Sequence, residues 1–79
     1  MIMSVVIADV MLHIKEALDT SLLEQIKQGL LNLEGVDRAS YQSNIPHLMI
    51  VEYDSEVINA QAVLSFVREQ GYNASLVGL

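Results

Sequence analysis

Cysteine is missing from this chain of 79 residues, and basic residues are scarce. The absence of cysteine excludes disulfides, thiolate catalysis and thiolate metal sites. Four lysines and arginines stand against ten acidic residues, which gives a formal net charge of −6. Nucleic acids and anionic membrane surfaces are bound by clusters of basic side chains, so we expect neither as a partner.

A signal peptide and a membrane span are also not expected. The apolar run over residues 1–14 is interrupted by Asp9 and His13, has no basic segment before it, and is too short to cross a bilayer. We therefore expect a cytoplasmic protein. The length predicts one domain over residues 1–79, with a core at 9–77 and an N-terminal strand extension at 1–8.

What the chain has in excess is apolar residues. They make up 52% of the sequence, and a domain this small buries only about 60–65% of its unfolded surface. A face for self-association is therefore expected.

The most clearly marked element is a helix over residues 18–36. Leucine and isoleucine recur at helical spacing from Leu23 to Leu33, which predicts one buried face. Gly29 costs about 1 kcal/mol relative to alanine inside a helix and so predicts close approach to another element. Gly35 predicts a left-handed stop.

The start of this helix has more than one candidate cap. Ser21 and Glu24 have the spacing of a capping box, in which each side chain accepts a hydrogen bond from the backbone N–H of the other residue. Asp19 and Thr20 could provide the cap instead, and Asp19 also suits the positive end of the helix dipole.

The remaining elements follow from alternation and turn signals. Strands are predicted at 4–15, 36–43, 47–53 and 72–77, and a second helix at 60–70 between Asn59 and Gly71. The first strand exceeds the usual length, so an overhang or a bulge is expected in it, and residues 44–46 form a turn signal. The order βαββαβ predicts a ferredoxin-like α+β sandwich, a four-stranded antiparallel sheet with both helices on one face.

Three short motifs in this order resemble the heavy-metal-associated domain of copper chaperones and metal-pumping P-type ATPases. They are LEGV at 33–36, VEYD at 51–54, and Gly71-Tyr72 followed by Ala74. The resemblance covers about residues 9–77 and implies the same fold.

The resemblance also implies where a metal would be held. Members of that family carry Gly-Met-Thr-Cys-x-x-Cys, whose two thiolates bind Cu(I) or a similar soft ion. The matching stretch here is 16–22, with Asp19 and Leu22 at the two cysteine positions. The family's usual copper site is therefore absent, and we expect no bound metal or other cofactor.

Methionine and histidine offer an alternative set of ligands. Met11 and His13 share one face of the first strand, and His47 and Met49 share one face of the third. Thioether and imidazole groups bind copper. Methionine more often fills gaps in a core, however, and we expect Met49 to do so beneath the helices.

Carboxylates offer another set. Glu16, Asp19 and Glu24 could bind a hard cation, although acids at this place more often form a solvated cap on the positive end of a helix. Enzymatic activity is not expected, because His13 as a base would need a cleft and an orienting partner that a flat sheet does not provide.

The open face of the sheet gives the leading hypothesis. If Met49 faces the helices, Leu48 and Ile50 face away from them, and Met11 joins them across the sheet. Scattered apolar residues are common on surfaces, but a solvated sheet face would carry polar residues here.

We therefore predict an interface made by Met11, His13, Leu48 and Ile50. The predicted function is a non-enzymatic interaction or dimerisation module in a metal-handling setting, which binds itself or a larger protein. The alternative is a metal carrier that uses Met/His or carboxylate ligands.

Overall fold

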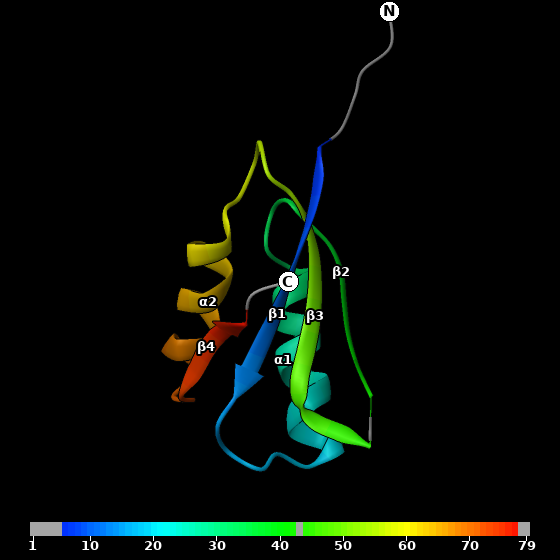
Figure 1. The fold of residues 1–79 in the computed structure, drawn as a ribbon, viewed down its shortest axis with the longest axis vertical. Helices are drawn as coiled ribbons and strands as arrows, with labels where there is room; N and C mark the ends of the chain where they lie inside the picture. Colours follow the sequence, from blue (N-terminus) through cyan, green and yellow to red (C-terminus); the bar gives the residue numbers. More distant parts are fainter. Residues whose placement is uncertain (1–5, 43, 78–79) are drawn as a thin grey trace, which may run out of the picture.

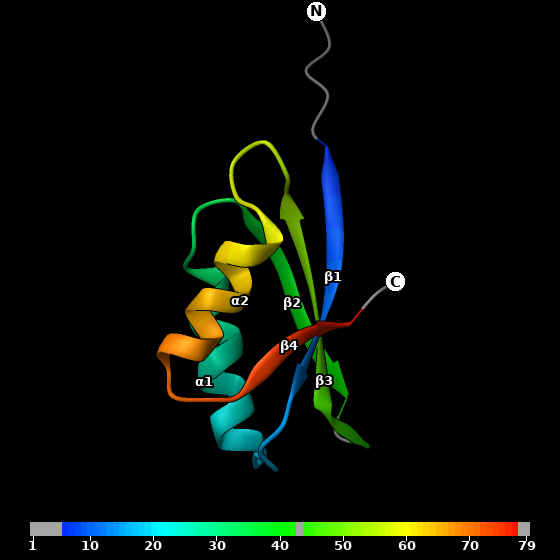
Figure 2. The same ribbon diagram turned by 60° about the vertical axis from the view of Figure 1, so that its left-hand side comes forward.

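The chain forms two layers, a sheet and a pair of helices. The structure is a computed structural model that describes residues 6–42 and 44–77. Its elements are β1 (Ile7–Ile14), α1 (Thr20–Leu31), β2 (Val36–Gln42), β3 (Ile45–Asp54), α2 (Ala60–Glu69) and β4 (Ala74–Val77). The strands form one antiparallel sheet in the order β2-β3-β1-β4 (Figure 1). Both helices cover the same face of this sheet (Figure 2), which confirms the ferredoxin-like fold.

The hydrophobic core lies between the sheet and the helices. Leu12, Met49 and Val51 from the strands and Leu30 and Val63 from the helices have no exposed surface. Full burial of such a side chain contributes about 1.5–3 kcal/mol. Met49 therefore fills the core, as predicted.

Helix α1 begins at a different cap from the predicted capping box. Asp19 is the N-cap, and its Oδ1 accepts the backbone N–H of Leu22 at 2.9 Å. Ser21 lies inside the first turn, and the Glu24 carboxylate accepts the hydroxyl of Tyr41 instead of reaching back to the cap. The capping box was wrong because a strand residue competes successfully for Glu24.

The same helix is also shorter than predicted at its far end. It ends at Leu31 with Asn32 as the C-cap, because the chain must turn back at this point to enter β2. Gly35 has a φ of 96°, left-handed as predicted, but it lies in the turn after the helix. A Cβ at Gly35 would meet Ile58 Cγ2 at 2.8 Å and Val57 Cγ1 at 2.9 Å.

Helix α2 packs closely against α1. A Cβ on Gly29 would lie 2.6 Å from Cζ of Phe66, which is the close approach predicted for that glycine. The N-cap of α2 is Asn59, as predicted, and its Oδ1 accepts the N–H of Ala62 at 2.8 Å. Gly71 follows the helix with a φ of 98°.

Strand β1 pairs with β3 in one uninterrupted register from Ile7 to His13. Of the two alternatives expected for the long first strand, an overhang or a bulge, the described residues show no bulge against β3, and the register shifts lie in the pairing of β2 with β3. Ile7 and Ala8, which lie within the predicted strand extension, pair with Asp54 and Tyr53 of β3. The start of the predicted strand and most of the predicted extension, residues 1–5, lie outside the described residues.

Two other strand boundaries differ from the predictions. Strand β3 begins at Ile45, within the predicted turn, because Ile45 still pairs with Gln42 of β2. Strand β4 begins at Ala74 rather than Tyr72, because the pairing of β4 with β1 ends at Ala74.

Candidate functional site

The two positions that match the family's cysteines hold a helix cap and a packing residue. Asp19 is exposed, and one of its carboxylate oxygens bonds the N–H of Leu22. The Leu22 side chain is half-buried and packs against the core. A soft ion would find one hard oxygen and no second donor here.

The loop before α1 is tied to the loop before β4 by a carboxylate. Glu16 accepts the backbone N–H of Asn73 at 2.9 Å and its side-chain amide at 2.8 Å. Lys15 N–H donates to the carbonyl oxygen of Asn73 at 2.7 Å. The bond from the backbone N–H of Asn73 is the main cause that lowers the pKa of Glu16 below its ordinary 4.5. We call this contact the Glu16–Asn73 clasp.

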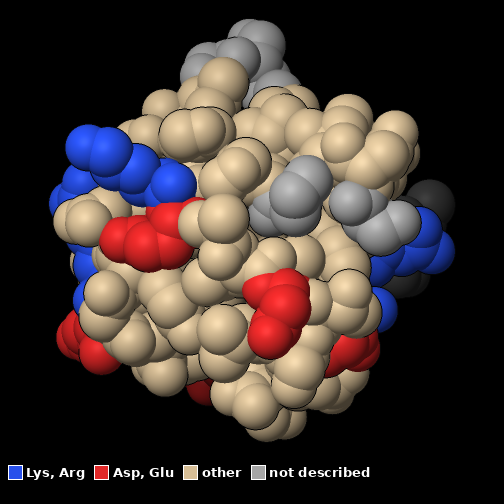
Figure 3. Space-filling view, turned by 90° about the horizontal axis from the view of Figure 1, so that it is seen from below, with Lys and Arg blue, Asp and Glu red and all other residues tan. Residues whose placement is uncertain are grey.

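The three acidic residues proposed as a carboxylate site do not converge. Glu16 is engaged in the clasp, Asp19 caps α1, and Glu24 accepts the hydroxyl of Tyr41. Within the described part of the chain, no group of three or more histidines and acids could hold a metal ion. Acidic side chains are also spread apart over the end of the molecule viewed in Figure 3.

The four residues of the predicted interface lie together on the sheet face opposite the helices. Met11 pairs directly with Ile50, and His13 pairs with Leu48. Ile50 is 41% exposed, His13 is exposed, and Met11 and Leu48 are half-buried. We call these residues the open-face cluster.

The apolar surface extends beyond the open-face cluster. Val77, opposite Met11, is 36% exposed, and Ile45 is 44% exposed. A hollow of about 370 Å³ lies over this region, and its apolar walls come from Met11, Ile45, Leu48 and Ile50. The sequence prediction missed Ile45 because it was assigned to a turn, and Val77 could have been found from the alternation of the last strand.

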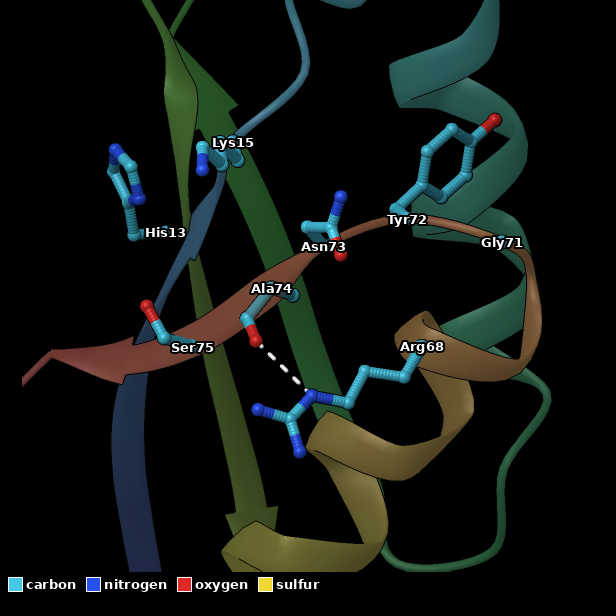
Figure 4. A pocket seen from close by; sticks show the side chains of 8 residues that line it. All are labelled: His13, Lys15, Arg68, Gly71, Tyr72, Asn73, Ala74 and Ser75. Atoms are coloured by element: carbon cyan, nitrogen blue, oxygen red, sulfur yellow. Dashed lines mark hydrogen bonds between the residues drawn. The ribbon is translucent and has the colours of Figure 1, made fainter.

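A second hollow of about 680 Å³, which we call the β4 hollow, adjoins the end of the open face (Figure 4). His13, Lys15 and Arg68 contribute to its lining, and Arg68 Nε donates to the carbonyl oxygen of Ala74 at 3.1 Å. The one salt bridge among the described residues joins Lys27 to Glu24, so Lys15 and Arg68 have no carboxylate of that part of the chain within 4.0 Å. Sequence spacing gave no signal for this cluster.

The two histidines of the chain lie side by side. The ring centroids of His13 and His47 are 6.0 Å apart. Nδ1 of His47 is 2.9 Å from the carbonyl oxygen of Ile14. Because a carbonyl only accepts, Nδ1 carries the proton, and the lone pair of Nε2 stays available in the neutral ring. Met49, expected beside His47, is fully buried beneath the helices.

No protein-family model and no curated protein sequence matches the chain. Solved structures do match it. Oxidized MerP from Ralstonia metallidurans CH34 has a TM-score of 0.82 and 16% identity, and the match covers 92% of this chain and all of that one. A copper binding domain from HMA7, a P-type ATPase, has a TM-score of 0.79 and 14% identity, with 89% of this chain and 93% of that one covered.

The N-terminal domain of PacS from Synechocystis PCC6803 is similar as well. Its TM-score is 0.75 at 15% identity, over 90% of this chain and 98% of that one. The chain has the fold of a heavy-metal-associated domain. Identities this low establish the fold and leave the chemistry to be argued from this chain's own residues.

Among its neighbours of the heavy-metal-associated fold, the HMA7 domain binds copper. No helix in the described residues is long and apolar enough to cross a membrane.

Proposed function

We propose that this chain is a member of the heavy-metal-associated family that binds protein in place of a thiolate-held metal. It is a non-enzymatic module of a metal-handling system and docks on itself or on a larger protein through the open-face cluster. The observation that carries this proposal is Ile50, which is 41% exposed at the middle of the open sheet face. Met11 and Leu48 beside it are only half-buried.

The energetics favour covering this face. Burial of a large aliphatic side chain contributes about 1.5–3 kcal/mol, and several such side chains meet around the hollow over Met11 and Ile50. Association costs at least about 4 kcal/mol in lost freedom of motion. A partner that covers the cluster at once can therefore offset that cost, whereas scattered apolar residues could not.

Photo-cross-linking inside cells tests the proposal. A photoreactive amino acid at position 40 replaces Ser40, which is exposed and pairs with Ile50. Position 61 on α2 is the matched control, because Gln61 is exposed on the helical layer. We expect a protein adduct from position 40 that Ile50→Asp abolishes, and its mass distinguishes a second copy from a larger partner. Equal yields from both positions, or an adduct that survives Ile50→Asp, would contradict the proposal.

The histidine pair supports metal carriage as a second candidate function. Two imidazoles that bind one ion through Nε2 at about 2 Å have ring centroids about 5–6 Å apart, close to the 6.0 Å between His13 and His47. The bond from Nδ1 of His47 to Ile14 is the kind of support that orients a metal-binding imidazole.

Titration with Cu(I), Zn(II) and Ni(II), followed by NMR, tests this candidate. We expect ring signals of both histidines to shift together, and His47→Gln to weaken binding at least tenfold. Shifts that persist in the His13→Gln, His47→Gln double variant, or no shifts at all, would exclude the pair.

A further inference from the structure

The open face carries charge in a definite order along β1. Its outward residues are Asp9, Met11 and His13, and Lys15 continues the alternation just beyond the strand. The order is therefore acidic, apolar and basic. Figure 4 shows His13 and Lys15 at the basic end, where both line the β4 hollow.

Strand β3 repeats the acidic and apolar parts of this order beside β1, while the basic end is supplied by β1 alone. Glu52 pairs with Asp9 at the acidic end, and Ile50 pairs with Met11 in the apolar middle. Arg38 of β2 lies opposite Glu52 and offsets part of its charge, so the acidic end retains one net negative charge from these three residues. At the basic end, Glu16 is close enough to Lys15 to interact with it electrostatically, but no salt bridge forms there among the described residues.

We propose that the partner of this face is a second copy of the chain in the reversed orientation. This rests on the proposed function. The two sheets stack face to face and are related by a twofold axis. This axis lies between the sheets, runs at right angles to the strands, and passes over the Leu12–Met49 pair. Asp9 of each copy then faces Lys15 of the other, because positions 9 and 15 are equally distant from Leu12.

The same axis brings the apolar residues together. Ile50 of one copy faces Leu48 of the other, and Met11 faces His13, so the whole open-face cluster is used. A twofold axis parallel to the strands would instead place Asp9 against Asp9 and Lys15 against Lys15. Like charges across an interface disfavour that arrangement.

The required size fits one face of the domain. A standard stable interface buries about 800 Å² on each partner. This is about one sixth of the surface of the chain, which is 5085 Å². A larger protein with an unrelated charge pattern would gain no advantage from the acidic-to-basic order, whereas a reversed copy matches it at both ends.

Charge reversal tests the arrangement. Lys15→Glu and Asp9→Lys should each raise the dissociation constant of the dimer about threefold to thirtyfold, because each converts two attractive pairs into repulsive ones. The double variant should return to within about twofold of the original value. Positions 9 and 15 lie about 20 Å apart along one strand, so they cannot compensate within a single copy. Sedimentation equilibrium at low salt gives the constants.

The matched controls are Lys27→Glu and Glu69→Lys, which change the net charge equally on the helical layer and should leave the constant unchanged. Added salt should weaken the original dimer and strengthen that of Lys15→Glu. Single variants without effect, or a double variant that stays weak, would overturn the reversed arrangement. A monomer at millimolar concentration would overturn it as well. The proposed function survives these results if position 40 cross-links to a larger protein, or to a second copy in another orientation, and fails with them if it gives no adduct that depends on Ile50.

Discussion

Two glycines have a left-handed backbone conformation, and they differ in what surrounds them. Gly35 has a φ of 96° and would place a Cβ within 3.0 Å of Val57 and Ile58. Gly71 has a φ of 98°, and nothing lies within 4 Å of its Cβ position. Only the first glycine is therefore required for both its conformation and its small size.

Alanine substitution should separate these two effects. We expect Gly71→Ala to lower the free energy of unfolding by about 1 kcal/mol, the cost of a left-handed alanine. Gly35→Ala should lower it by about 3 kcal/mol, because overpacking against Val57 and Ile58 is added. Urea denaturation measures both values, and equal losses would show that the contacts around Gly35 relax freely.

The start of α1 is also decided by a single residue. Asp19→Ala should destabilise the domain by about 1 kcal/mol, because the N–H of Leu22 loses its acceptor. Ser21→Ala is the matched control and should change stability by less than about 0.5 kcal/mol, since Ser21 lies within the helix. Thermal denaturation followed by circular dichroism compares them; a larger loss in Ser21→Ala would restore the capping box.

Among the elements, the connection that matters most for the family comparison is the Glu16–Asn73 clasp. It joins the loop at which the family resemblance places a metal site to the loop before β4, and the two loops are far apart in the sequence. The carboxylate of Glu16 is thereby engaged in holding two loops together. A loop fixed in this way suits a structural role better than the exchange of an ion.

The clasp should make stability depend on pH in a defined direction. The pKa of Glu16 is lowered in the folded chain, so its charged form contributes stability above pH 4.5, and this contribution is lost as pH falls through the lower folded value. Glu16→Gln removes the titration but keeps an acceptor. We expect the original chain to be more stable than Glu16→Gln at pH 6 and the two to converge below pH 4. A constant difference across this range would contradict the assignment.

The sequence predicted the features of the sheet that depend on the alternation of apolar and polar residues along a strand. The core positions of β1 and β3, and hence the outward direction of Met11 and Ile50, follow from a period of two. The N-cap could not be predicted, because Asp19 and Ser21 are both good caps. In the structure the hydroxyl of Tyr41 donates to the carboxylate of Glu24, so Glu24 does not complete a capping box with Ser21.

On the scale of the whole molecule, sequence reasoning missed the side-chain groupings that join segments far apart in the chain. His13 and His47 meet only because β1 and β3 pair in one particular register. Lys15 and Arg68 share a hollow because α2 leads into β4, which lies beside β1. Spacing along the chain carries no information on such contacts until the register of the sheet is known.

The bond from Arg68 to the carbonyl of Ala74 has a consequence for how copies can assemble. It places a charged side chain over the outer border of β4, where an additional strand from another molecule would otherwise pair. Growth of the sheet sideways into an open-ended polymer is hindered there. In the proposed face-to-face dimer the stacking closes after two molecules, so the apolar face would be covered without leading to a fibre.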